Sequence, residues 1–168
     1  MRIRFSRRCP SRIALWATAL YAGLRRGELL ALEWSNVDLA SGVIRVERAW
    51  DAYAGFIEPK SEQGRRKVPI PAVLRDYLVE HRMRQSRANG LVFGKSATVP
   101  FDPGTAVRKA DNAWKAAKLD RITLHEARHT FASYMIAAGV NAKALSTYMA
   151  RPTWATRTSA SRLTATGT

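Results

Sequence analysis

The segment from Thr123 to Gly139 carries the residues with the clearest capacity for chemistry, and it reads TLHEARHTFASYMIAAG. Thr123 and Glu126 have the spacing of a capping box, which predicts that a helix begins here, and Gly139 is typical of a helix end. His125 and Arg128 are three residues apart, so they would point from neighbouring turns at one object. An imidazole and a guanidinium can bind a phosphate together, with His donating or moving a proton and Arg donating as a fork.

The same segment matches HExxH, a pattern in which two His on one helical face bind zinc and Glu acts as a base. His125 and His129 would be the ligands, with Glu126 as the base. A catalytic zinc needs a third protein ligand, and after Glu126 the chain holds no Asp, Glu or Cys and no His except His129. Asp102 or Asp120 could supply that ligand from upstream, while the Arg inside the turn opposes a cation. A zinc hydrolase is therefore an alternative interpretation, and no metal site is predicted.

The charge of the chain favours a polyanionic partner. Its 168 residues include 28 Lys and Arg against 13 Asp and Glu, a net charge of +15, and 46% are hydrophobic. This size and composition predict one folded domain, and the basic excess indicates nucleic acid. No stretch is long and apolar enough to span a membrane, no secretory signal is visible, and the single Cys fits a reducing compartment. We expect a cytoplasmic, nucleoid-associated protein with no membrane partner and no cofactor.

Helices dominate the elements that must position these residues. Besides the segment already described, apolar residues recur at helical spacing in five stretches: 11–21, 24–32, 71–88, 102–118 and 142–149. Val73 and Tyr134 are expected to face the core. Alternation predicts a strand at 43–48, and further short strands are expected at 55–59 and 66–70, joined as a hairpin with a basic tip. The expected fold class is mainly α with a small antiparallel β-sheet (α+β).

Arg25 and Arg26 open the helix predicted at 24–32. A cation at a helix N-terminus is unfavourable for the helix dipole, so a pair of them indicates that something anionic is held nearby. Simple solvation of both side chains is the other interpretation, and this stretch alone leaves both open.

Three blocks of sequence, in this order, resemble the tyrosine recombinases, or phage-type integrases. They are GLRRGEL at 23–29, PKS at 59–61 followed by RKVPI at 66–70, and LHEARHTFAS at 124–133. The resemblance covers residues 12–149, which would be the catalytic domain, preceded by a basic tail at 1–11 and followed by a divergent tail at 150–168 that we expect to be disordered. It implies site-specific DNA strand exchange, for integration or recombination, through a phosphotyrosine.

The resemblance also implies a site. Arg25 and Arg128 would hold the two non-bridging oxygens of the scissile phosphate, His125 would donate to it or move a proton, Lys60 would protonate the leaving 5′ oxygen, and Glu28 would support the Arg residues from behind. Cations placed around an attacked phosphodiester stabilise the negative charge that gathers there, and a Lys among other cations has a lowered pKa suited to an acid. Further contacts to double-stranded DNA are expected from Arg26, Arg65, Arg66 and Lys67.

Past Met149 the sequence departs from the family, which continues with a Gly-His pair and then a helix that carries the nucleophilic Tyr. Here Arg151 lies near the place of that His and Ala160 near the place of the nucleophile. No Tyr follows Tyr148, so no nucleophile is identified, and Tyr148 is a remote candidate only. Without a nucleophile no covalent phosphotyrosyl intermediate forms, so we expect DNA binding with impaired strand transfer. The alternative is a non-catalytic DNA-binding remnant or regulator.

A frameshift just after Met149 is our hypothesis for this departure. The family's separate N-terminal DNA-clamping domain is also missing from the sequence, which is typical of a truncated integrase. In the family the C-terminal segment docks onto a neighbouring subunit, so the resemblance implies a homo-oligomer on DNA, and the departure in that segment argues against it.

Overall fold

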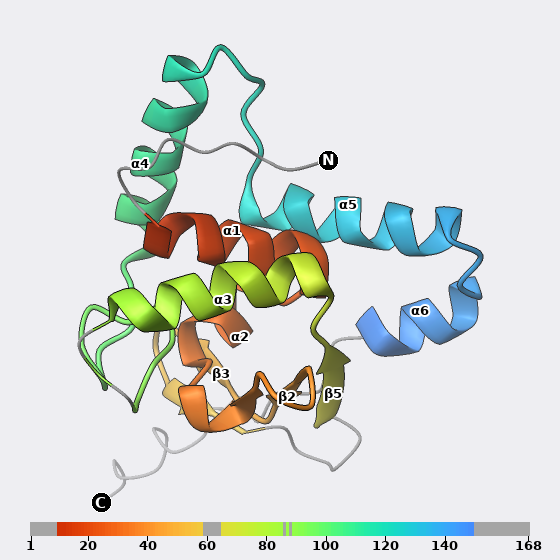
Figure 1. The fold of residues 1–168 in the computed structure, drawn as a ribbon, viewed down its shortest axis with the longest axis horizontal. Coiled ribbons are helices and arrows are strands. Elements are labelled where there is room, and N and C mark those ends of the chain that lie inside the picture. The colour runs from red at the N-terminus through yellow and green to blue at the C-terminus, as the bar shows by residue number, and fades with distance from the viewer. Residues whose placement is uncertain (1–9, 59–64, 86, 88, 150–168) are drawn as a thin grey trace, which may run out of the picture.

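The structure is a computed structural model that describes residues 10–58, 65–85, 87 and 89–149 (Figure 1). Its helices are α1 (Pro10–Ala22), α2 (Arg26–Ala31), a 3-10 turn η1 (Trp34–Asn36), α3 (Ala72–Arg84), α4 (Pro103–Ala116), α5 (Leu124–Ala137) and α6 (Ala142–Met149). Its strands are β1 (Val37–Asp38), β2 (Val43–Val46), β3 (Ala49–Asp51), β4 (Gly55–Ile57) and β5 (Arg66–Pro69). The expected class, mainly α with small antiparallel sheets, is confirmed.

Helix α1 is the centre of the core and packs against both α3 and α5 (Figure 1). Its residues from Ala14 to Ala19 are all buried, so the helix is enclosed on every side. A helix that is apolar all round is stable only where neighbours cover each face. Trp16 meets Trp114 of α4 edge to face, with ring centroids 6.2 Å apart, and this pair attaches α4 to the end of the core.

The strands form two small antiparallel sheets, β1-β2-β5 and β3-β4. The predicted hairpin between 55–59 and 66–70 is therefore wrong, because β4 pairs with β3 whereas β5 pairs with β2. Burial sets this pairing: Ile44 of β2 lies opposite Val68 of β5, and both side chains are fully enclosed. Strands β3 and β4 instead join through a local turn, in which the Asp51 carboxylate accepts hydrogen bonds from two backbone N–H groups. Of the predicted basic tip at 60–66, residues 60–64 lie outside the described residues.

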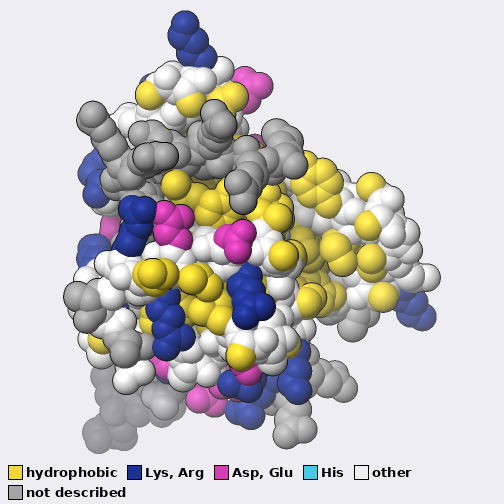
Figure 2. Space-filling view, viewed as in Figure 1, with side chains coloured by type: hydrophobic (Ala, Val, Ile, Leu, Met, Phe, Trp, Pro, Cys, Tyr) yellow, Lys and Arg dark blue, Asp and Glu magenta, His cyan; other side chains and the backbone are white. Residues whose placement is uncertain are grey.

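Two expected core side chains are exposed, so those predictions are wrong. Val73 is 40% exposed and Tyr134 is 57% exposed. The C-terminal half of α5, to which Tyr134 belongs by sequence, extends beyond α1 (Figure 1). Figure 2 shows hydrophobic side chains gathered on this α5–α6 arm, and a second group mixed with charged side chains over α3. Gly139, with a φ of +84°, ends α5 as predicted. Within the described ranges no helix is long and apolar enough to cross a membrane.

His81 of α3 is buried although it was not expected to be a core residue, and this position makes a pH prediction. Its Nε2 lies 2.7 Å from the Val92 carbonyl oxygen and its ring stacks on Phe93, and burial lowers the pKa of His81. Between that lowered pKa and the unfolded value of about 6.5, the unfolded chain binds more protons, so stability falls as pH falls. We expect the free energy of unfolding in urea to decline below about pH 6.5, by up to about 1.4 kcal/mol per pH unit.

The variant His81→Gln tests this origin. It is expected to be less stable at every pH but to lose the slope near pH 6, whereas His129→Gln, which changes an exposed His, keeps it. Equal slopes in the wild type and His81→Gln would contradict the assignment.

Candidate nucleic-acid interface

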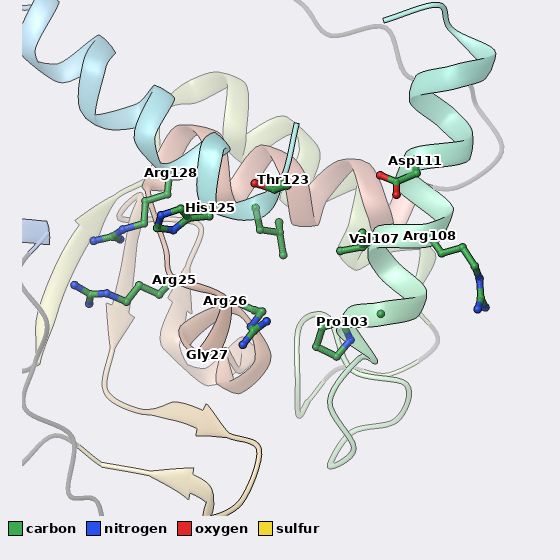
Figure 3. A pocket seen from close by; sticks show the side chains of 12 residues that line it. Arg25, Arg26, Gly27, Pro103, Val107, Arg108, Asp111, Thr123, His125 and Arg128 are labelled. Atoms are coloured by element: carbon green, nitrogen blue, oxygen red, sulfur yellow. The ribbon is translucent and has the colours of Figure 1, made fainter. Parts of the chain in front are cut away.

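A cavity of about 840 Å3 opens between the start of α2, the first turns of α4 and the start of α5 (Figure 3). Pro103, Val107 and Leu124 contribute apolar lining, and Asp111 is the acid among the lining residues. Asp111 already accepts a hydrogen bond from Arg121 at 2.8 Å. The cations of the lining outnumber that acid, so the cavity suits an anion. They are Arg25, Arg26, Arg108 and Arg128, with His125 beside them.

Arg25 and Arg128, which we call the arginine clamp, converge on one oxygen atom although they are far apart in sequence. Arg25 precedes α2 and Arg128 lies in α5. Nη2 of Arg25 donates to the carbonyl oxygen of Met149, and Nη2 of Arg128 donates to the same oxygen at 3.0 Å. Nη1 of Arg128 also donates to the carbonyl oxygen of Gly23. An oxygen acceptor between two guanidinium groups occupies the position that an anion would take.

The local sequence explains why both arms of the arginine clamp point the same way. Gly23 has a φ of +63°, and a Cβ at this position would lie 2.4 Å from a ring carbon of Phe131, so the chain can turn sharply here only with glycine. Arg25, two residues after Gly23, is the N-terminal cap of α2. On α5 the predicted capping box is present, with Thr123 Oγ1 accepting from the Glu126 backbone N–H at 3.2 Å and Thr123 N–H donating to the Glu126 carboxylate at 2.6 Å.

Arg128 is only 7% exposed. Burial, with the positive charge of Arg25 beside it, lowers the pKa of Arg128 to about 10. The guanidinium of Arg25 disfavours the charge of Arg128 in a site where water screens little. The arginine clamp would therefore gain more from an added anion than an exposed pair of Arg residues would.

Glu28 is the acidic partner of Arg25, one of the two Arg residues at the start of α2. It is 1% exposed, and its carboxylate accepts from the Arg25 backbone N–H at 2.8 Å and from Arg25 Nη1 at 3.0 Å. Arg66 of β5 donates to both carboxylate oxygens, at 2.8 and 2.7 Å. Burial alone would raise the pKa of Glu28, but the hydrogen bonds and charges of Arg66 and Arg25 outweigh it and lower that pKa. Arg26, by contrast, is exposed at the cavity.

His125 and His129 are both exposed, and their Nε2 atoms lie 2.8 Å apart. His125 lines the cavity next to Arg128 (Figure 3). The carboxylate of Glu126 belongs to the capping box, and that of Asp102 caps α4 by accepting from the Thr105 N–H. The described part of the chain contains no group of three or more His, Cys, Asp or Glu residues that could hold a metal ion.

The residues expected to contact DNA from β5 lie differently from one another. Arg65 and Lys67 are exposed, and Arg65 lies 3.9 Å from the Glu58 carboxylate. The Arg66 side chain is 13% exposed and is directed inward to Glu28. Arg66 and Val68 are two residues apart on one strand and share a face. Because Val68 is apolar, its expected burial could have indicated from the sequence that Arg66 points inward. Lys60 lies outside the described residues, as do Arg151 and Ala160.

Tyr148, the candidate nucleophile, is held by three neighbours. Its hydroxyl donates to the Ala22 carbonyl oxygen at 3.1 Å, and the Arg66 guanidinium lies over its ring, 5.4 Å from the centroid. Its ring also packs against that of Phe131. Burial raises the pKa of Tyr148 to about 12. The hydroxyl is thus protonated at neutral pH and bound to a backbone carbonyl.

The chain resembles known proteins over most of its length. Residues 5–156 match the Phage integrase family. The chain is 29% identical to the prophage integrase IntR of Escherichia coli K12, over 83% of this chain and 40% of that protein. It is 31% identical to the integrase of Salmonella phage P22, over 73% of this chain and 31% of that protein. The chain therefore spans about two fifths or less of the length of these curated relatives.

Solved structures give the same likeness. The Tn1549 transposon integrase in complex with circular intermediate DNA superposes with a TM-score of 0.66 at 25% identity, covering 86% of this chain and 53% of that one. The XerA recombinase superposes with a TM-score of 0.64 at 25% identity, covering 82% of this chain and 46% of that one.

Proposed function

The chain belongs to the phage integrase family, and from this premise we propose that it binds double-stranded DNA by holding one backbone phosphate in the arginine clamp. One observation carries the proposal: guanidinium groups of Arg25 and Arg128 donate to a single oxygen, that of Met149. A phosphate presents several such oxygens and a full negative charge. Two planar forks suit its non-bridging oxygens better than two ammonium groups would.

The surrounding residues take roles by position. His125 lies beside Arg128 in the cavity and would donate to the bound phosphate or move a proton. Arg26 is exposed at the same cavity and would contact a neighbouring phosphate, as would Arg65 and Lys67. Lys60 stays the predicted acid for a leaving 5′ oxygen. By this proposal the protein acts on the DNA of the nucleoid in the cytoplasm.

We further propose that this chain binds DNA without exchanging strands. Strand transfer by this family's chemistry needs a nucleophilic Tyr, and by the resemblance Ala160 stands near the place of that residue. The Tyr148 hydroxyl donates to the Ala22 carbonyl and has a pKa near 12, so it is poorly prepared to attack a phosphate. These contacts favour the DNA-binding remnant or regulator over an active recombinase, and the homo-oligomer implied by the resemblance is not required for binding by one chain.

A nicked duplex tests both halves of the proposal. We expect the protein to retard the duplex on a native gel at low salt, with binding that falls steeply as salt rises because phosphate contacts release counterions. On a denaturing gel we expect no covalent protein–DNA adduct. The Tyr148→Phe variant serves as the matched control and should retard the duplex at least as strongly as the wild type does, because it loses only the hydrogen bond to the Ala22 carbonyl.

Two results would contradict the proposal. An affinity for the duplex that does not change with salt concentration would show that the protein does not bind through phosphate contacts. An adduct that forms with the wild type and disappears with Tyr148→Phe would make Tyr148 a nucleophile and the chain an enzyme.

A further inference from the structure

We propose that Arg66, rather than contacting DNA, is a positioning residue that orients Arg25 through the buried carboxylate of Glu28. The inference rests on the proposed function, since it assigns to Arg66 a part in binding the same phosphate. It also replaces the DNA contact that the sequence predicted for this residue.

The carboxylate of Glu28 is shared evenly between the two Arg residues. Its Oε1 accepts from Nη1 of Arg66 at 2.8 Å and from Nη1 of Arg25 at 3.0 Å. Its Oε2 accepts from Nη2 of Arg66 at 2.7 Å and from the backbone N–H of Arg25 at 2.8 Å. Two parallel bonds from one guanidinium fix the plane of a carboxylate. Arg66 therefore determines where the two oxygens stand, and these oxygens in turn hold the backbone and the Nη1 of Arg25.

This arrangement leaves one end of Arg25 for the anion. With Nη1 directed to Glu28, Nη2 of Arg25 is directed to the oxygen that it shares with Arg128. If the carboxylate rotates, Nη1 loses its acceptor and Nη2 loses its direction. Arg25 then regains side-chain freedom, which must be lost again when a phosphate binds.

The surroundings of Arg66 are those of an internal residue. Its side chain is 13% exposed, and the ring of Tyr148 covers the guanidinium at 5.4 Å. Both of its Nη atoms are engaged with Glu28. The next residue, Lys67, is exposed on the opposite side of the strand and is the one that a DNA backbone can reach.

Arg66 also connects two parts of the sequence that the proposed function needs together. It is the first residue of β5, the strand that follows the segment carrying Lys60, and it bonds the same carboxylate as Arg25. A single buried anion thus fixes α2 and the start of β5 to each other. Arg66 fixes the position of β5 relative to α2 through two hydrogen bonds from one guanidinium to Glu28. A Lys cannot donate in this two-pronged geometry.

A double-mutant cycle on duplex binding separates positioning from contact. Arg25→Ala is expected to lower the affinity about tenfold or more, as expected for loss of a hydrogen bond to a charged group. Arg66→Gln is expected to lower it as well, but to have little further effect in the Arg25→Ala background, because its influence passes through Arg25. Lys67→Gln removes the same charge from the neighbouring residue and should instead add to Arg25→Ala.

Additive effects of Arg66→Gln and Arg25→Ala would make Arg66 a direct DNA contact and overturn the inference. Unchanged affinity in a folded Arg66→Gln protein would leave Arg66 a structural residue only, which also overturns it. Arg66→Lys keeps the charge and is used in the same cycle, so the test does not depend on the folding of one variant. Wild-type affinity in Arg66→Lys would rule out the need for a fork.

A measurement without DNA keeps this inference distinct from the proposed function. In 15N-labelled protein, the side-chain resonances of Arg25 are expected to shift and broaden in Arg66→Lys and Arg66→Gln, and to stay unchanged in Lys67→Gln. Unchanged Arg25 resonances would overturn the positioning role whether or not the protein binds DNA. If the resonances shift but Arg25→Ala binds duplex as the wild type does, the proposed function fails while the structural link between Arg66 and Arg25 stands.

Discussion

Arg128→Ala is expected to weaken duplex binding by about tenfold to a hundredfold, the effect of removing hydrogen bonds from a charged group to its acceptor. Arg128 is 7% exposed and shares its acceptor oxygen with Arg25, so no neighbouring water can take over its position easily. The logarithm of the affinity should also depend less steeply on the logarithm of the salt concentration, by about 0.9, because one phosphate contact is lost. Fluorescence anisotropy of a labelled duplex across a salt series measures both quantities.

Two further variants separate geometry from charge. Arg128→Lys should keep much of the salt dependence and still lose most of the affinity, because an ammonium cannot donate as a fork. Arg84→Ala removes one charge from the exposed face of α3, where Arg84 pairs with Glu80, and should change the affinity little. Equal losses in Arg84→Ala and Arg128→Ala would indicate that only net charge matters, against a specific site.

Glu28→Gln is expected to lower the free energy of unfolding by about 3–5 kcal/mol, because removing one partner of a buried ion pair leaves the other charge uncompensated. Glu28 is 1% exposed and is bonded to both Arg25 and Arg66, so the substitution weakens four hydrogen bonds at once. Urea denaturation at neutral pH measures the loss. The matched control is Glu80→Gln, whose carboxylate pairs with Arg84 at the surface and should cost less than about 1 kcal/mol.

The pH dependence of this effect has a definite sign. The pKa of Glu28 is lower in the folded protein than in the unfolded chain, so its contribution is present above the unfolded value of about 4.3. The contribution is lost as pH falls through the folded pKa, since the unfolded chain then binds the proton first. Glu28→Gln should therefore flatten the acid part of the stability curve. A loss in Glu28→Gln no larger than that in Glu80→Gln would contradict the buried network.

Features encoded by neighbouring residues could be predicted from the sequence. Thr123 and Glu126 predict the start of α5, and Gly139 predicts its end. Both signals can be recognised in the sequence because they depend on a few adjacent backbone groups. The pairing of strands could not be predicted in this way. Strand β4 pairs with β3, its neighbour in sequence, whereas β5 pairs with β2, which is separated from it in sequence by β3 and β4. The pairing of β5 with β2 depends on burying Ile44 and Val68 together. The residues near either one in sequence do not indicate this contact. Tyr134 was misjudged for the same reason, since helical spacing gives a face but not how far the partner helix extends.

The candidate site divides in the same way. The spacing of His125 and Arg128 on one helix predicted that they serve one object, and the structure puts both at one cavity. That Arg25 joins them depends on packing α2 against the rest of the fold. The oxygen between the two guanidinium groups belongs to the backbone of Met149, and a backbone carbonyl leaves no signature in residue types.

That oxygen has a thermodynamic consequence. The protein supplies its own acceptor to Arg25 and Arg128. Under the proposed function a DNA phosphate would therefore bind by exchange, because it would have to displace the end of α6. The net binding free energy would then be the intrinsic binding free energy of the two guanidinium groups, reduced by the free energy that keeps the Met149 carbonyl oxygen in place. The hydrogen bond from Tyr148 to Ala22 contributes to that hold, so under the proposed function a change that loosens the last turn of α6 is expected to tighten the binding of DNA.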